Sequence, residues 1–193
     1  MDKQTCIING HPDPSPEHYI PALADAYEAG AQAAGFATTR INVGQIEFEC
    51  LRRPSDFGEA PSQAIRDAQK QLLDSQHVAL FFPIWLSAMP AYTRAFIEQM
   101  GRSEFMIHES DNGFPQPQMR DKSLRIVCTM GMPAVAYRVG FGAFGVRSLE
   151  KGVFGLAGFH PIHHTLIGGI EGMTDTERNQ WLGKIGEMGR KGQ

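Results

Sequence analysis

Three loops of the sequence carry the residues that could do chemistry. Residues 10–18 (GHPDPSPEH) lead into a helical pattern, and the backbone amides at such a helix start can hold a phosphate. Residues 83–90 (PIWLSAMP) place a tryptophan and backbone amides between two prolines. Residues 129–138 (TMGMPAVAYR) place Gly131 where the backbone must approach another group closely, with a tyrosine after it. A phosphate cradle with two rims of amides suits a planar heterocycle with a phosphorylated tail, and a flavin has that shape.

These loops have to be brought together by the elements that precede them. Each loop follows a compact apolar run that predicts a β-strand, at residues 4–9, 77–83 and 123–129. Two further strand-like runs cover residues 38–43 and 159–167. Helical patterns cover residues 18–34, 62–75, 91–101 and 140–157, and a capped helix begins near residue 174. Strands and helices therefore alternate along the chain.

This alternation predicts an α/β fold, a parallel sheet with helices on both faces. Right-handed crossovers leave few arrangements of five such strands, and we expect the order 2-1-3-4-5. In such an open sheet, ligands bind beyond the carboxyl ends of the strands, at the switch point between the first and third. The three loops all lie at that edge. No internal repeat or linker divides the chain, so we expect a single domain over residues 1–193.

Composition and charge exclude several classes of protein. The hydrophobic fraction of 42% and the charged fraction of 20% are those of a globular domain, not of a disordered chain. A net charge of -3 argues against a surface that coats nucleic acid. No apolar run is long enough to span a membrane, and we expect no signal peptide ahead of the first strand. The three cysteines, Cys6, Cys50 and Cys128, form neither a disulfide framework nor a zinc set, so we expect a cytoplasmic protein.

At its three loops the sequence resembles the flavodoxin-like NAD(P)H:quinone oxidoreductases, the family that includes DT-diaphorase and modulator of drug activity B. The resemblance spans nearly the whole chain, and residues 124–170 resemble a bacterial branch of NAD(P)H dehydrogenases in particular. It rests on Gly10-His11-Pro12 with Tyr19, on Phe82-Pro83-Ile84-Trp85 with Pro90 and Ala91, and on Thr129-Met130-Gly131 with Tyr137. The fold that it implies is a flavodoxin-like three-layer sandwich around the five-stranded sheet.

The resemblance also implies a role for each matching residue. The flavin phosphate is held at His11, Ser15, Glu17 and His18. The isoalloxazine ring is rimmed by the backbone of Pro83, Ile84, Trp85 and Leu86, and its pyrimidine edge is lined by Thr129, Met130 and Gly131. Tyr137 takes the catalytic position and faces the N1/O2 region of the ring, where negative charge develops.

The implied activity is transfer of two electrons from NAD(P)H to a quinone-like acceptor by a ping-pong mechanism. FAD is the expected cofactor, because the irregular segment 44–61 could hold an adenosine, and FMN is the alternative. A second interpretation is a non-enzymatic module, either an electron carrier or a regulatory subunit of a membrane transporter. The net charge of -3 fits an acidic carrier poorly.

The sequence departs from the family pattern at three places. Glu17 puts a carboxylate into the phosphate loop. The histidine that the animal enzymes carry after the tyrosine is missing from residues 141–144. Residues 106–109 (MIHE) replace an aromatic lid, which bears on the preference for quinones.

One long connection predicts an interface. The stretch 102–118 has no helical pattern to bury its apolar residues, which are Phe105, Met106, Ile107 and Phe114. Exposed apolar patches of this kind mark interaction surfaces. We therefore expect a homodimer with both active sites at the interface.

Three other motifs suggest chemistry that the surrounding sequence does not support. Residues 140–145 match the glycine pattern of a dinucleotide fingerprint, but they lie well past a strand end, and we expect close helix packing there instead. A histidine cluster invites a metal, yet strand alternation puts its middle member on the opposite face, so we expect no metal site at His160, His163 and His164. Asp13 lacks the second acid that a phosphoacceptor site needs after the third strand.

Overall fold

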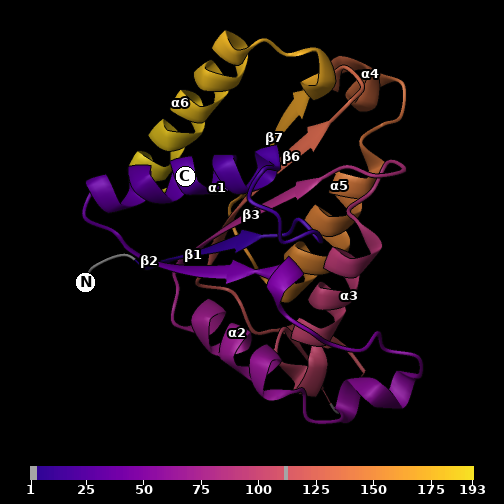
Figure 1. Cartoon of the computed structure of the whole chain (residues 1–193). Coiled ribbons are helices and arrows are strands. Elements are labelled where there is room, and N and C mark those ends of the chain that lie inside the picture. The colour runs from indigo at the N-terminus through magenta and orange to yellow at the C-terminus, as the bar shows by residue number, and fades with distance from the viewer. Residues whose placement is uncertain (1–3, 111–112) are drawn as a thin grey trace.

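The computed structural model describes residues 4–110 and 113–193, with a parallel five-stranded sheet at its centre. The strands are β1 (Gln4–Asn9), β2 (Ala37–Asn42), β3 (His77–Pro83), β6 (Ser123–Met130) and β7 (Ile162–Gly168). They lie in the order β2-β1-β3-β6-β7 (Figure 1), which confirms the predicted order 2-1-3-4-5. The switch point therefore lies between β1 and β3.

Helices cover both faces of the sheet and make it the middle of three layers (Figure 1). On one face, α1 (Tyr19–Ala33) and α6 (Asp175–Lys191) pack against each other. The other face carries α2 (Gln63–Leu73), α3 (Ala91–Met100), α4 (Ala134–Val139) and α5 (Phe144–Ser148). Short 3-10 helices are η1 (Val43–Gln45), η2 (Pro54–Gly58), η3 (Arg102–Glu104) and η5 (Ile170–Gly172), and η4 (Leu149–Gly155) is a π-helix. Within the described residues, none of the helices combines the length and apolar character that crossing a bilayer requires.

The strands are apolar because both faces of the sheet are covered. Every residue of β3 is buried. Along β1, Ile7 joins the apolar cluster under α1 and α6, whereas its neighbour Ile8 joins the cluster under α2 and α3. This alternation is what the pleat of a strand imposes, and it leaves the carboxyl edge of the sheet to the loops.

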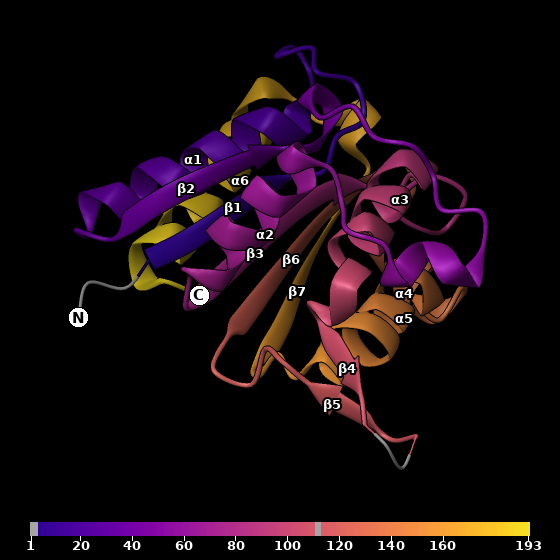
Figure 2. The same ribbon diagram turned by 90° about the horizontal axis from the view of Figure 1, so that it is seen from below.

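The connection 102–121 differs from its prediction. It contains an antiparallel hairpin, β4 (Ile107–Glu109) with β5 (Pro115–Pro117), that projects from the domain (Figure 2). Met106 is buried, and Phe105 and Ile107 pack against the core. Of the four apolar residues expected at the surface, Phe114 alone is largely exposed, so the core itself covers the others.

The last third of the chain differs in two further details. The helix predicted over 140–157 begins only at Phe144, because Gly142 and Ala143 before it have φ of +62° and +48°, and it then widens into η4. The last strand begins at Ile162 and not at residue 159. Phe159 instead leaves the sheet and packs edge-to-face against Phe154 in the core.

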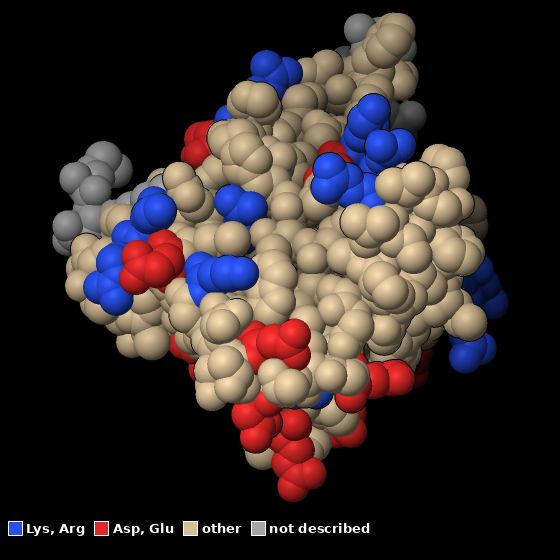
Figure 3. All heavy atoms as spheres, turned by 90° about the horizontal axis from the view of Figure 1, so that it is seen from above, with Lys and Arg blue, Asp and Glu red and all other residues tan. Residues whose placement is uncertain are grey.

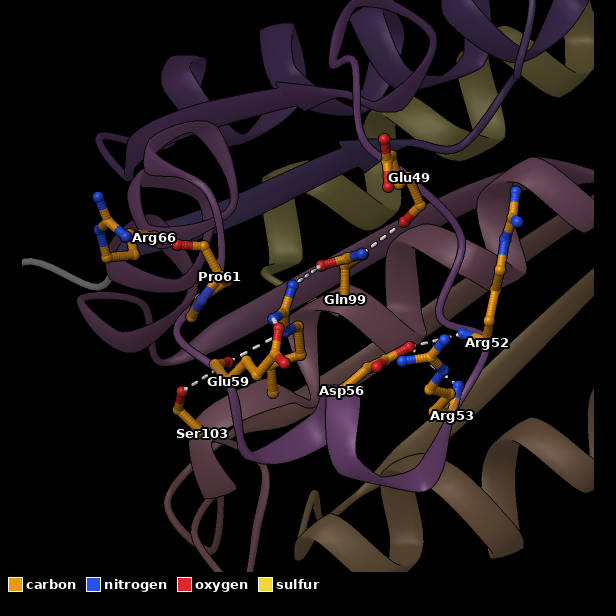
Figure 4. A network of polar contacts seen from close by, with 10 residues as sticks. Glu49, Arg52, Arg53, Asp56, Glu59, Pro61, Arg66, Gln99 and Ser103 are labelled. Carbon is orange, nitrogen blue, oxygen red and sulfur yellow. Dashed lines mark hydrogen bonds and ion pairs between the residues drawn. The ribbon is translucent and has the colours of Figure 1, made fainter.

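The irregular segment 44–61 is fastened to the end of α3 and to η3 (Figure 4). Gln99 donates to the carbonyl of Glu49, and Arg102 donates to the carbonyl of Glu59 at 3.1 Å. Only the start of the segment approaches the switch point, where a Cβ on Gly44 would lie 2.6 Å from the Pro12 carbonyl oxygen. Most of the segment therefore lies along α3, away from the carboxyl edge of β1.

Candidate functional site

The backbone holds the three loops together beyond the carboxyl ends of β1, β3 and β6. The Gly10 amide donates to the Phe81 carbonyl at 2.7 Å, which ties the first loop to β3. The Ile84 amide donates to the Thr129 carbonyl at 2.7 Å, which ties the second loop to β6. The sheet thus brings together the three loops that the sequence singles out.

The first loop is folded around the carboxylate of Asp13. One carboxylate oxygen lies 2.8 Å from Nε2 of His18, and the other accepts from the Ser15 amide at 2.9 Å. The His18 ring stacks on the ring of His11, with the centroids 3.8 Å apart. Asp13 therefore already binds the Ser15 amide and the His18 ring, two groups that were expected to bind a phosphate. Sequence reasoning missed this role, although an aspartate two residues before an amide that it accepts from is the pattern of an Asx turn.

α1 begins directly after this loop and lacks the usual N-terminal caps. His18 occupies the N-cap without a side-chain capping hydrogen bond, and the first turn contains no acidic residue. The first amides of a helix have no partner within it, and the helix dipole makes that end positive. The Glu17 side chain is exposed, so its carboxylate can remain in solvent. The start of α1 is therefore suited to an anion.

Burial and neighbouring charges set the protonation of the loop. Burial lowers the pKa of His11, against a hydrogen bond to the Asp13 backbone that raises it, so the imidazole is neutral at pH 7. The hydrogen bond with His18, followed by the one from the Ser15 amide, lowers the pKa of the Asp13 carboxyl. Nδ1 of His11 lies 3.0 Å from the Asp13 carbonyl, and its Nε2 makes no hydrogen bond to any described residue. The loop thus presents one uncommitted imidazole nitrogen beside an ionised carboxylate.

The second loop is a tight turn of two residues. The Trp85 amide donates to the Ala88 carbonyl at 2.9 Å, and the Ala88 amide donates back to the Trp85 carbonyl at 3.0 Å. Between them, Leu86 and Ser87 have φ of +47° and +67°. Turns of this type favour asparagine and glycine, because a left-handed backbone costs other residues roughly 1–2 kcal/mol each. Something else in the protein must hold this turn.

The turn determines which backbone amides of residues 83–90 are free. Pro83 has no N–H, and the amides of Ile84 and Trp85 both donate within the protein. The amides of Leu86, Ser87 and Met89 have no acceptor among the described residues, and the first two are adjacent within the turn. The Leu86 side chain is fully exposed and that of Trp85 is half exposed. The loop can therefore offer a ligand two adjacent N–H groups and an apolar border.

The third loop offers backbone and not side chains. Thr129 and Met130 are buried, so only their main chain can reach a ligand. At Gly131 a Cβ would lie 3.0 Å from Oε1 of Glu171, and its nearest neighbours all belong to that carboxylate group. The expected approach of Gly131 to a ring edge stays a prediction, and within the protein the glycine leaves room for Glu171. That residue follows β7 in η5, and nothing in the sequence near Gly131 points to it.

Tyr137 is fully buried, and its hydroxyl donates to the Ser87 carbonyl at 2.8 Å. Burial raises the pKa of the phenol, while hydrogen bonds from the backbone amides of Val146 and Gly145 lower it. The hydroxyl therefore stays protonated at neutral pH and has protein partners for both its donor and its acceptor sites. The predicted catalytic role requires a free Tyr137 hydroxyl, whereas in this structure the hydroxyl is hydrogen-bonded to Ser87 in the second loop.

The remaining motifs find structural partners. A Cβ on Gly145 would lie 2.2 Å from the Ser87 carbonyl oxygen, so the glycine pattern at 140–145 does allow close packing. All three histidines of residues 160–164 are exposed, and Nδ1 of His164 lies 2.5 Å from the Glu150 carboxylate. Nowhere in residues 4–110 and 113–193 do three His, Cys, Asp or Glu side chains gather in a way that could hold a metal ion.

Apolar side chains gather beside the second and third loops. We call this set the apolar rim, and its members are Trp85, Leu86, Val135, Val139, Phe141 and Phe144. Figure 3 shows a broad area without charged side chains on the side where α4 and α5 lie. A cavity of about 690 Å³ lies elsewhere, between η2, α3 and the β4–β5 hairpin, and none of the predicted site residues lines it.

Known proteins share this architecture. A protein-family model, Flavodoxin_2, described as a flavodoxin-like fold, matches residues 3–187. No curated protein matches the chain in sequence. Among solved structures, an NAD(P)H:quinone oxidoreductase from Methanothermobacter marburgensis is similar with a TM-score of 0.81 at 16% identity, over 99% of this chain and 97% of that one.

Two bacterial structures are similar in the same way. Smu.1420 from Streptococcus mutans gives a TM-score of 0.80 at 18% identity, over 97% of this chain and 99% of that one. An FMN-dependent NADH-azoreductase from Bacillus anthracis, in complex with FMN, gives 0.75 at 11% identity, over 98% of each chain. At such identities the likeness shows the fold alone.

Proposed function

Because the chain belongs to the family of the flavodoxin-like fold, matched over residues 3–187, we propose that it is a flavin-dependent NAD(P)H dehydrogenase. It passes two electrons from NAD(P)H to a quinone-like acceptor. The observation that carries the proposal is the pair of unpartnered amides at Leu86 and Ser87, at the same sheet edge as the uncapped start of α1. A flavin needs donors at its ring edge and an anion site for its phosphate, and this edge supplies both.

The first loop fits the phosphate end of such a molecule. Its donors are the amides of Tyr19 and Ile20 at the start of α1 and, in the tautomer whose Nδ1 accepts from the Asp13 amide at 3.2 Å, the Nε2–H of His11. The Ser15 amide and the His18 imidazole become donors as well once they exchange Asp13 for the phosphate. The exposed Glu17 contributes its backbone and not its carboxylate.

The second and third loops fit the ring. With a flavin bound, the amides of Leu86 and Ser87 would donate to the part of the ring where negative charge develops, and fixed amides stabilise such charge without reorganisation. The backbone of Thr129, Met130 and Gly131 lines the adjoining edge, since the first two side chains are buried. When bound, a flavin supplies the hydride acceptance and donation that the side chains of this loop cluster do not. The apolar rim keeps water from the exposed side of the site and favours an apolar, planar acceptor.

The proposal predicts that the purified protein is yellow. Chromatography of the released cofactor then distinguishes FAD from FMN. FAD remains our expectation, and the approach of Gly44 to Pro12 supports it by placing the start of segment 44–61 beside the phosphate loop. Absorbance spectra of the protein as purified and after incubation with each flavin test the proposal. A protein that stays colourless with both FAD and FMN would contradict it.

The proposal includes a homodimer whose active sites lie at the interface. The apolar rim supports this better than the stretch 102–118, because it exposes six large apolar side chains next to the site, whereas the stretch exposes Phe114. Light scattering at micromolar concentration should give twice the chain mass. The variant Phe144→Ser should shift that mass toward one chain, and a wild-type monomer would contradict the proposal.

A further inference from the structure

The Leu86–Ser87 turn is left-handed although neither residue is a glycine or an asparagine. Its own hydrogen bonds join Trp85 and Ala88 and close the turn, but they use neither the amides nor the carbonyls of Leu86 and Ser87. Support comes from the segment that follows the third loop. Two of its residues, Tyr137 and Gly145, reach the Ser87 carbonyl.

Tyr137 holds the Ser87 carbonyl by a direct hydrogen bond. The donor is the buried hydroxyl, at 2.8 Å, and this hydroxyl is itself fixed by the backbone amides of Gly145 and Val146. A carbonyl oxygen fixed in this way fixes the plane of the Ser87–Ala88 peptide, and with it the C-terminal end of the turn that carries the two amides. A rotated Ser87 would leave a buried hydroxyl without its acceptor, which is costly.

Gly145 allows the same carbonyl to lie where it does. A Cβ at this position would lie 2.2 Å from the Ser87 oxygen and 2.9 Å from the Ala88 Cα, distances that no side chain tolerates. Gly145 does not have a positive φ, so the need for glycine here is proximity and not conformation. The last glycine of the pattern at 140–145 is thereby explained.

We propose that Tyr137 and Gly145 are positioning residues that fix the Leu86–Ser87 turn and, through it, the two amides that meet the flavin. The inference rests on the proposed flavin site but is separate from it, because the turn exists without a ligand. It gives the glycine pattern at 140–145 a function in flavin binding that is unrelated to dinucleotide phosphates. It also makes Tyr137 act through Ser87 and not on the reacting atoms.

Trp85, at the corner of the turn, reports the turn without any ligand. The chain has two tryptophans, so a Trp181→Phe background isolates the Trp85 fluorescence. In that background Tyr137→Phe should lower the anisotropy of Trp85 in the flavin-free protein. The Kd for flavin should rise about tenfold, the loss expected when one buried hydrogen bond is removed. The matched control is Tyr27→Phe, which removes a buried hydroxyl bonded to His77 at the other end of the sheet and should change neither quantity.

A rescue separates positioning from general stability. Ser87→Gly removes the strain of the left-handed backbone, so adding it to Tyr137→Phe should restore the Kd to within about threefold of the parent. Gly145→Ala should also loosen Trp85 and weaken flavin binding, and Ser87→Gly should not rescue it, because the clash is with the main-chain oxygen. Gly189→Ala, whose Cβ would lie 2.0 Å from the Tyr27 carbonyl oxygen, is the matched clash away from the site.

The outcomes divide cleanly between the two proposals. If wild type binds no flavin, the proposed function fails, while the Trp85 anisotropy of the variants still decides the role of Tyr137 and Gly145. If wild type binds flavin and Tyr137→Phe leaves both anisotropy and Kd unchanged, the positioning role is overturned. Failure of Ser87→Gly to restore binding overturns it as well.

Discussion

Asp13 determines how the first loop can accept a phosphate. Its carboxylate bonds the Ser15 amide and the His18 ring, so it stands in for the anion that those groups would otherwise bind. The lowered pKa of this carboxyl keeps it ionised at neutral pH. A phosphate entering the loop must therefore overcome a fixed negative charge and take over two occupied donors. The same carboxylate also orders the loop, so one residue both shapes the site and competes for it.

This competition predicts that Asp13→Asn tightens flavin binding. The amide keeps the shape of the side chain and removes the charge, so we expect the Kd to fall roughly three- to tenfold at low ionic strength. Titration of the apoprotein by flavin fluorescence measures the change. Glu17→Gln is the control, because the exposed Glu17 carboxylate lies in the same loop but makes no hydrogen bond to any described residue of that loop. Weaker binding in Asp13→Asn would show that ordering the loop matters more than its charge.

Gly131 and Glu171 should behave as a pair. Gly131→Val places a side chain against the exposed Glu171 carboxylate, which must shift, and we expect flavin binding to weaken as a result. If the contact is with Glu171, adding Glu171→Ala should recover much of the affinity in Gly131→Val. Circular dichroism should show an intact fold in both variants. Equal loss with and without Glu171→Ala would place the clash elsewhere.

At the scale of elements, the strands could be predicted because strands buried on both faces appear in the sequence as continuous apolar runs. Residues 77–83 coincide with β3 for this reason. The β4–β5 hairpin could not be predicted, because each of its strands has three residues and Pro115–Pro117 has no apolar alternation. Its pairing with Ile107 depends on the folded chain. In the site, the positions of the three loops could be predicted from the ends of the strands that precede them. The contact of Glu171 with Gly131 depends instead on how separate segments pack.

The contact between α1 and α6 yields a prediction about stability. Gly189 lies so close to α1 that a Cβ would be 2.0 Å from the Tyr27 carbonyl oxygen, so Gly189→Ala must push the helices apart. We expect a loss of about 1–3 kcal/mol in the free energy of unfolding, the usual cost of overpacking. Gly183 lies on the same helix with nothing within 4 Å of its Cβ position. Gly183→Ala should stabilise the protein by up to about 1 kcal/mol. Urea unfolding followed by circular dichroism measures both, and equal effects would contradict the packing argument.

At the scale of the molecule, we propose that the site has a single opening. The loops after β1, β3 and β6 meet at one edge of the sheet, and the exposed side chains of the apolar rim lie beside them. A second nucleotide site is not available at residues 140–145, because Gly145 is packed against Ser87. Both substrates of the proposed reaction must therefore use the same opening.

This shared opening predicts ping-pong kinetics. The nicotinamide and the acceptor each have to reach contact distance of the same reacting atom, roughly 3–3.5 Å, so they cannot bind there together. The oxidised nicotinamide must leave before the acceptor enters, and the enzyme keeps the two electrons in between. Initial rates measured with NAD(P)H and a small quinone should give parallel lines in double-reciprocal plots. Excess acceptor should compete with NAD(P)H, since both occupy the opening next to Leu86. Intersecting lines would mean that both substrates bind at once, which requires a second site that the packing of Gly145 on Ser87 denies to the 140–145 segment.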